Sequence, residues 1–232
     1  MFYKLSNTAP LQVIERAFDK KYEYPNLFES SPVINGLKES TLSIITANKS
    51  TKIQFAIWGL LPEDFEDNWD VFQNVTNTLN VNLEQLNKSD PFYNDALNNR
   101  RCLIIVTGFF TSYLHNGSIQ PYHIHLKNHE PFCIAGVYNK LNDGFLTSSI
   151  LITNVYKSFI KIPNLSIYKP LIIKPELYSD WLDENQSFSD LQNKIEKRES
   201  YNFESHPIKK DGYDNEATYN KISKALSKSH SY

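Results

Sequence analysis

The chain has 232 residues, and its 24 Lys and Arg against 26 Asp and Glu leave a net charge of −2. This balance excludes a protein that attracts nucleic acid through an overall positive field, although a local basic groove remains compatible with it. Only four of the basic residues are Arg, so the bidentate contacts that Arg makes with phosphate are scarce. The apolar content of 41% is enough for a sizeable core.

The two cysteines, Cys102 and Cys133, each lie within an apolar run. Free cysteines in such runs are typically buried and reduced, and no CxxC spacing indicates a zinc site. The N-terminal segment lacks a basic stretch followed by a long apolar one, and no apolar run reaches the roughly 18 residues of a membrane span. We therefore expect a cytoplasmic protein with no membrane partner.

A helix is predicted within residues 7–22 (NTAPLQVIERAFDKKY). Thr8 is the candidate N-cap of this helix. Leu11, Ile14 and Phe18 recur at helical spacing and predict its buried face.

The next segments change character several times. Residues 42–47 and 53–62 are predicted strands, and the second ends at a proline. Residues 63–80 are polar and rich in Asn and Asp, which indicates a long loop or short helices. Residues 91–99 predict a short helix.

The middle of the chain is rich in β-type sequence. Four strand-like runs are separated by turn signals such as HNGS and NDG. They are residues 102–110, 120–126, 131–138 and 148–154. Their short spacing favours antiparallel hairpins over βαβ units, so we expect an α+β fold with one antiparallel sheet in a single domain.

The C-terminal part is more polar. Residues 176–186 and 189–199 predict helices, and a strand is expected around residues 206–210. Residues 211–232 are low in aliphatic side chains, which favours a loose tail. We therefore place the domain at residues 1–210 and the tail at 211–232.

Five phrases stand in an order and spacing typical of one family. They are WGLLP at 58–62, RRCL at 100–103, TGFFT at 107–111, EPFCIAGVY at 130–138 and WL at 181–182. Together they resemble the SRAP family (SOS response-associated peptidase, also called abasic-site processing proteins), and the resemblance spans nearly the whole chain. It implies a mainly antiparallel, barrel-like β core with a few peripheral helices.

The resemblance also implies a chemistry. SRAP proteins lose the initiator Met, and the amine and thiol of the cysteine exposed next condense with the aldehyde of an abasic site in single-stranded DNA. The product is a thiazolidine crosslink, and an Asn, a Glu and a His assist at the pocket. The same cysteine is credited with cutting its own preceding peptide bond. No cofactor is involved.

The cysteine position of the family pattern holds Phe2 in this chain. A benzyl side chain cannot close a thiazolidine, and its bulk leads us to expect that Met1 is retained. The family Asn matches Asn80. A rival match at Asn74 needs an insertion and loses the later match at Glu84.

The other two assisting groups are also replaced. The family Glu falls on Thr111, whose hydroxyl cannot act as a general acid or base near neutral pH. The family His falls on Pro163, or on Ser166 in a shorter alignment, and neither is a His. Asn80 is thus the one matched catalytic position, so the chain resembles a degenerate member.

The resemblance and the residue types also suggest contacts to DNA. The candidate residues are Lys4, Trp58, Asn82, Arg100, Arg101 and Tyr168. An exposed Trp58 would stack on a base, but a core position at a strand end explains it at least as well. The Arg100–Arg101 pair is equally well explained by a structural role.

A rival chemistry is metal binding. His123 and His125 are two residues apart on a predicted strand and therefore share a face. With His115 or His129 they are candidate metal ligands, but neither a carboxylate nor a Cys accompanies them at ligand spacing. We therefore interpret them as polar positions on a solvent-facing strand and expect no metal.

The sequence leads to two functional hypotheses. The first is a pseudoenzyme with the SRAP fold that cannot form the crosslink and binds single-stranded or abasic DNA weakly. The alternative is a protein-interaction module that kept the fold and does not bind DNA. The intact WGL phrase and Asn80 favour the first, and the scarcity of Arg favours the second.

Overall fold

The computed structural model describes residues 2–86, 91–154, 167–196 and 202–208. The helices of this part are α1 (Leu11–Phe18), α2 (Trp69–Thr76), α3 (Pro91–Asn99), α4 (Tyr178–Leu182) and α5 (Phe188–Glu196), with single 3-10 turns at Pro25–Leu27 and Pro175–Leu177. The strands are β1 (Lys4–Asn7), β2 (Lys21–Tyr22), β3 (Ser31–Asn35), β4 (Thr41–Thr46), β5 (Lys52–Trp58), β6 (Asn80–Asn82), β7 (Arg101–Val106), β8 (Gly108–His115), β9 (Ser118–Leu126), β10 (Phe132–Lys140), β11 (Leu146–Asn154), β12 (Tyr168–Pro170), β13 (Ile172–Ile173) and β14 (Phe203–Pro207).

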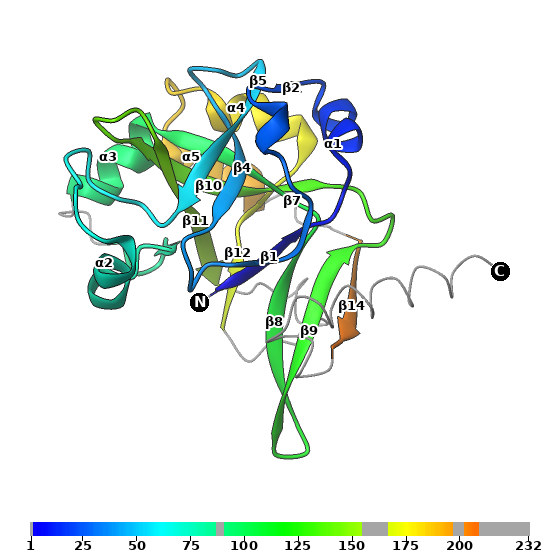
Figure 1. Cartoon of the computed structure of the whole chain (residues 1–232). Helices are drawn as coiled ribbons and strands as arrows, with labels where there is room; N and C mark the ends of the chain where they lie inside the picture. Colours follow the sequence, from blue (N-terminus) through cyan, green and yellow to red (C-terminus); the bar gives the residue numbers. More distant parts are fainter. Residues whose placement is uncertain (1, 87–90, 155–166, 197–201, 209–232) are drawn as a thin grey trace.

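The larger sheet closes on itself. Its strands follow the order β12-β11-β10-β7-β4-β5-β2, and β11 also pairs in parallel with β5 through Thr147–Ile57 and Ser148–Trp58. This pairing completes a ring of β11, β10, β7, β4 and β5 (Figure 1). The expected mainly antiparallel, barrel-like core in an α+β domain is confirmed, because every pair in the ring except β11–β5 is antiparallel.

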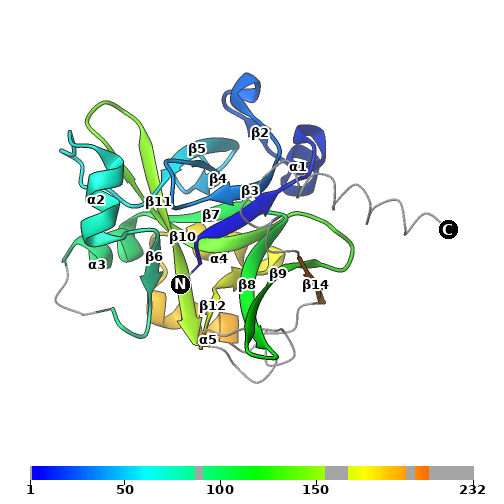
Figure 2. The same cartoon turned by 60° about the horizontal axis from the view of Figure 1, so that its bottom comes forward.

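A second sheet of five strands has the order β14-β9-β8-β1-β3 and is antiparallel throughout. Its β8–β9 hairpin extends away from the body of the molecule, with β14 alongside β9 (Figures 1 and 2). The chain passes from one sheet to the other at Thr107, between β7 and β8. Residues 102–110, predicted as one strand, are therefore two strands that belong to different sheets.

The ring strands β7, β10 and β11 are buried on both faces, which explains the long apolar runs of β7 and β10. One core cluster joins alternate ring residues to Phe2, Leu5, Phe109 and Ile124 of the five-stranded sheet region. The other joins the remaining ring residues to helices α1, α3, α4 and α5. In the described part, no helix is long and apolar enough to cross a membrane.

The N-terminal region differs in detail from the sequence expectation. The helix is shorter than residues 7–22, and its N-cap is Pro10, not Thr8. Thr8 instead donates its backbone N–H to Thr107 Oγ1 at 2.9 Å. The strands β1 and β3 were not expected, since each is short and gains its stability from pairing with the other and with β8.

Other expectations held more closely. The polar segment 63–80 contains α2, capped by the side chain of Asn68, and residues 91–99 form α3. The C-terminal strand lies at Phe203–Pro207, a few residues before the expected position. The tail at 211–232 lies outside the described residues.

Arg101 is a structural centre of the helical layer. It is 2% exposed, and its guanidinium donates to the carbonyl oxygens of five residues in α3 and around α4. They are Leu97, Asn98, Trp181, Asp183 and Gln186. Its neighbour Arg100 is partly exposed and pairs with Asp95. Arg101 is the first residue of β7, whereas Arg100 lies just before the strand.

Both cysteines are free, and both are fully buried, as predicted. Cys102 contacts the hydroxyl of Ser148, with Sγ and Oγ 3.6 Å apart. Burial raises the pKa of Cys102 to about 12 and raises that of Cys133 as well. Because the thiolate is the reactive form, neither thiol is reactive in the folded chain.

The two neighbouring arginines give a matched pair of variants. Arg101→Met leaves several buried carbonyl oxygens without donors, and we expect it to lower the free energy of unfolding by at least about 3 kcal/mol. Arg100→Met removes a surface ion pair, for which we expect about 1 kcal/mol or less. Urea unfolding followed by circular dichroism measures both, and equal losses would contradict the structural role of Arg101.

Thiol labelling tests the cysteine environment. We expect Ellman's reagent near neutral pH to label neither Cys102 nor Cys133 in the native chain and both in denaturant. The reason is their burial together with the raised pKa of each thiol. Rapid labelling of either thiol without denaturant would show that the core opens locally there.

Candidate functional site

The N-terminal segment is held by one side chain. The backbone N–H of Phe2 donates to Asn80 Oδ1 at 2.9 Å, and Asn80 Nδ2 donates to the carbonyl oxygen of Phe2 at 2.9 Å. Asn80 therefore pairs with the Phe2 backbone as a neighbouring strand would. This places the one matched family position directly against the residue at the family's cysteine position (Figure 2 shows the N-terminus beside β11 and β6).

The WGL phrase positions Asn80. Trp58 is fully buried, and its Nε1 donates to the carbonyl oxygen of Leu79, the residue before Asn80, at 2.9 Å. Gly59 adopts φ +120°, and a Cβ there would lie 2.4 Å from the Gln73 side chain. Gln73 in turn hydrogen-bonds Thr78 through both its amide atoms. Trp58 and Gly59 thus fix the segment that carries Asn80.

The Phe2 ring lies in an aromatic cluster. It is 3% exposed and meets Phe109 edge to face, with ring centroids 5.8 Å apart. Phe109 contacts Phe132 and Phe203 in the same edge-to-face manner, and those two rings contact each other at 5.4 Å. Position 2 is therefore occupied by an apolar ring that packs against Phe109 and belongs to a buried aromatic cluster.

Thr111 lies near this cluster. It is 4% exposed and lies two residues after Phe109 on β8, so the two side chains share a strand face. The resemblance assigns the family carboxyl to this position, where the chain carries a hydroxyl. Pro163 and the alternative Ser166 lie outside the described residues.

Two of the predicted DNA contacts are corrected by their burial. Trp58 is fully buried with its indole N–H bonded to Leu79, so no ring face is open for a base. Arg101 directs its guanidinium to main-chain carbonyls inside the molecule, so it has no donor for a phosphate on the surface. Trp58 is therefore a core residue and Arg101 has a structural role, the alternatives that the sequence analysis gave for them.

The other candidates are distributed differently. Lys4 is 8% exposed on β1. Asn82 and Tyr168 lie on strands on either side of β11, opposite Ile152 and Asn154, and both are half-buried. Gln85 Nε2 donates to the Tyr168 hydroxyl at 3.2 Å, which links the two sides. Asn82 lies on the same strand as Asn80, and Tyr168 lies across β11 from it.

The sequence analysis considered His123 and His125 as metal ligands and set them aside, without including Glu204 and His206. His123 and His125 do share a face of β9, but His125 is 4% exposed, so the interpretation as a solvent-facing strand is wrong. The register of β14 places Glu204 opposite His125 and His206 opposite His123. The carboxylate that the sequence lacked at ligand spacing comes from a strand about 80 residues further along.

The imidazoles of this region form a histidine cluster and are in mutual contact. The His125 ring stacks on His129 at 4.4 Å and on His206 at 4.9 Å, while His123 lies 5.4 Å away. Desolvation, with the neighbouring imidazoles adding to it, lowers the pKa of His123 to about 3, and the pKa of His125 is also lowered, mainly by burial. Both are therefore neutral near neutral pH.

The chain is similar in structure to several solved proteins. A crystal structure of a protein from Bacteroides thetaiotaomicron has a TM-score of 0.76 at 21% identity, covering 92% of this chain and 94% of that one. A protein from Bordetella bronchiseptica has a TM-score of 0.69 at 15% identity, covering 89% and 99%. A phage-related protein from the same organism has a TM-score of 0.61 at 14% identity, covering 90% and 94%. At these identities the likeness shows the fold.

No curated protein sequence is found to be similar to this chain. The model of one protein family, SOS response associated peptidase (SRAP), matches residues 1–212, which is most of the chain. The match includes the N-terminal strand, Asn80 and the closed ring described above. The protein therefore belongs to the SRAP family.

Proposed function

We propose that this SRAP protein is a pseudoenzyme that does not form the family's thiazolidine crosslink with abasic DNA. The observation that carries the proposal is the packing of Phe2. Its backbone is held on both sides by Asn80, and its ring is buried against Phe109. An apolar core residue stands where the family's chemistry requires a thiol.

Among the residues that the structure describes, neither Thr111 nor the two cysteines takes over the role of the missing thiol. The hydroxyl of Thr111 is a poor acid and base near neutral pH, so it cannot move the protons that the family carboxyl moves. Both cysteines are buried with raised pKa values, and neither offers a thiolate. The matched Asn80 is retained, and its side chain hydrogen-bonds the main chain of Phe2.

We further propose weak binding of single-stranded or abasic DNA beside the Asn80 strand. Asn82 lies on this strand, and Tyr168 lies across β11 from it. The half-buried Tyr168 ring offers a surface on which a base can stack. The near-neutral charge balance keeps the affinity low, because phosphate neutralisation supplies much of the binding energy for DNA.

The β8–β9 hairpin favours the second candidate function, a protein-interaction module. Near its tip Tyr113, Leu114 and Ile119 are 42%, 52% and 60% exposed, and the hairpin stands away from the body (Figure 1). Apolar side chains grouped on a projecting hairpin are typical of a protein contact. The burial of Trp58 and Arg101 also removes two of the expected contacts to DNA.

Incubation with an abasic single-stranded oligonucleotide tests the main proposal. We expect no heat-stable adduct on denaturing electrophoresis, because no N-terminal thiol is present. Any imine formed by a terminal amine, whose pKa is roughly 7.7–8.0, should appear only after borohydride trapping. Phe2→Cys restores the thiol but not the acid–base groups, so its adduct should form about 10²-fold or more slower than that of an intact family member.

Phe2→Ala is the matched control, since it opens the same space without a thiol. A heat-stable adduct of the wild-type chain would overturn the proposal. Fluorescence anisotropy with an undamaged single strand at low salt separates the two candidate functions. Weak binding that Tyr168→Ala reduces supports the DNA contact, and no binding at all supports the interaction module.

A further inference from the structure

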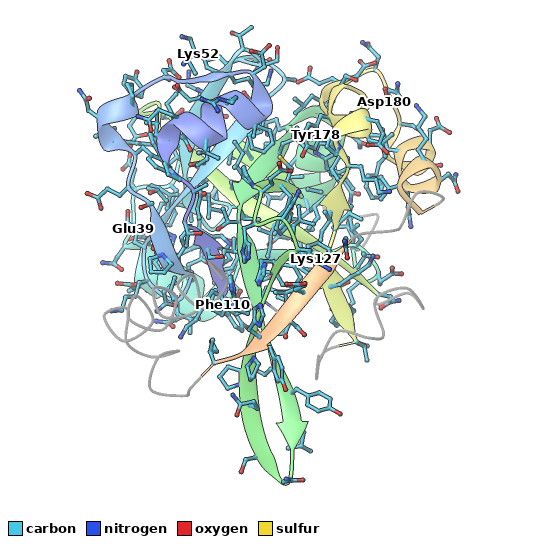
Figure 3. The ribbon with its side chains drawn as sticks, turned by 90° about the vertical axis from the view of Figure 1, so that its right-hand side faces the viewer. Glu39, Lys52, Phe110, Lys127, Tyr178 and Asp180 are labelled. Carbon is cyan, nitrogen blue, oxygen red and sulfur yellow. The ribbon has the colours of Figure 1, made fainter. Side chains whose placement is uncertain are left out.

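One outer face of the five-stranded sheet gathers side chains that bind metals. Directly opposed residues of antiparallel strands and residues two apart on one strand lie on the same face. By the β9–β14 register, His123, His125, Glu204 and His206 are therefore on one face. The inward face of the same strands carries Ile124, Leu126 and Phe203, which pack into the core. Figure 3 shows β14 crossing this region, with Phe110 and Lys127 labelled beside it.

Three of these side chains bring their ligand atoms together. One nitrogen of His125, one of His206 and a carboxylate oxygen of Glu204 all lie within 4.8 Å of one another. Tetrahedral zinc with bonds of about 2.0–2.1 Å needs ligand atoms about 3.3 Å apart. Side-chain rotations that move the ligand atoms by about an ångström would bring them to that separation. Such rotations are possible because His206 and Glu204 are only half-buried.

The His125 ring is already oriented as a ligand. Its Nδ1 lies 2.8 Å from the carbonyl oxygen of Leu126, and a carbonyl only accepts, so Nδ1 carries the proton. Nε2 therefore presents a lone pair. A ligating imidazole typically donates its other N–H to a backbone carbonyl or carboxylate in this way.

His123 supports the face without joining the three ligands. Its Nε2 lies 2.8 Å from the Ser6 hydroxyl, and Gly108 leaves the room for this contact. A Cβ at position 108 would lie 2.3 Å from that nitrogen. The glycine of the TGFFT phrase thus has a packing role under the histidine cluster.

We propose that His125, Glu204 and His206 form a binding site for a divalent transition-metal ion, with zinc the best match. Two imidazoles and one carboxylate are a ligand set that zinc uses with a fourth, open position. The His129 ring stacks on the His125 ring and is a further imidazole beside the site. The ion would join β9 to β14, the last described strand and an edge of its sheet.

The charges around the site favour a cation. The carboxylate of Glu204 brings a negative charge to the cluster of imidazoles. Lys127 lies 3.9 Å from a Glu204 carboxylate oxygen, but this pair is solvent-exposed and contributes little stability. A metal ion can therefore displace Lys127 at small cost.

Titration of the purified chain with Zn²⁺ near neutral pH tests the site. We expect one saturable site per chain by isothermal calorimetry, and visible absorption of bound Co²⁺ with the intensity typical of four-coordination. Glu204→Gln and His206→Ala should each weaken the affinity at least about 10-fold. Zn²⁺ should also raise the melting temperature of the wild type and leave that of the double variant unchanged.

Lys127→Met is the matched control on the same face. Because it removes a competing cation and no ligand, its affinity for zinc should equal or exceed that of the wild type. The proposal is overturned if the wild type shows no saturable zinc site, if both ligand variants keep the wild-type affinity, or if Lys127→Met binds more weakly than they do. Far-UV circular dichroism establishes whether each variant is folded. If a variant is not folded, the Co²⁺ spectrum of the wild type alone decides whether the site exists.

Discussion

The paired hydrogen bonds between Phe2 and Asn80 are the constraint on which the site depends. They join the N-terminal segment to β6, and β6 is paired with the ring strand β11. The Phe2 ring then packs on Phe109 of the other sheet. One residue thereby connects the two sheets, and its side chain is part of the core between them.

The family phrases of this chain are explained by structural duties. Trp58 and Gly59 hold the segment before Asn80, Arg101 ties β7 to the helical layer, and Gly108 admits His123 beside Ser6. None of these duties requires a reactive group. A chain can therefore keep the fold of the family while the residues that carry the chemistry change.

The sequence predicted the ring strands well, because strands buried on both faces have unbroken apolar runs such as residues 102–106. It did not predict β1 or β3, since short strands are stabilised by partners distant in the chain. The resemblance matched Phe2 and Asn80 to two positions of the family pattern, and the structure shows them hydrogen-bonded to each other. The histidines of β9 were considered as metal ligands and set aside, because Glu204 and His206 join His125 only through the register of β14. Burial of Trp58 and Arg101 depends on helices packed over and beside their strands, which local sequence does not specify.

The central claim is that Phe2 is a core residue and not an accessible reactive position. Urea unfolding of Phe2→Ala against Phe2→Leu tests it most directly. Truncation to Ala should lower the free energy of unfolding by about 3–5 kcal/mol, as for other buried phenylalanines, and Leu should retain much of it. A loss below about 1 kcal/mol for Phe2→Ala would show that the ring is not packed in the core and would contradict the account.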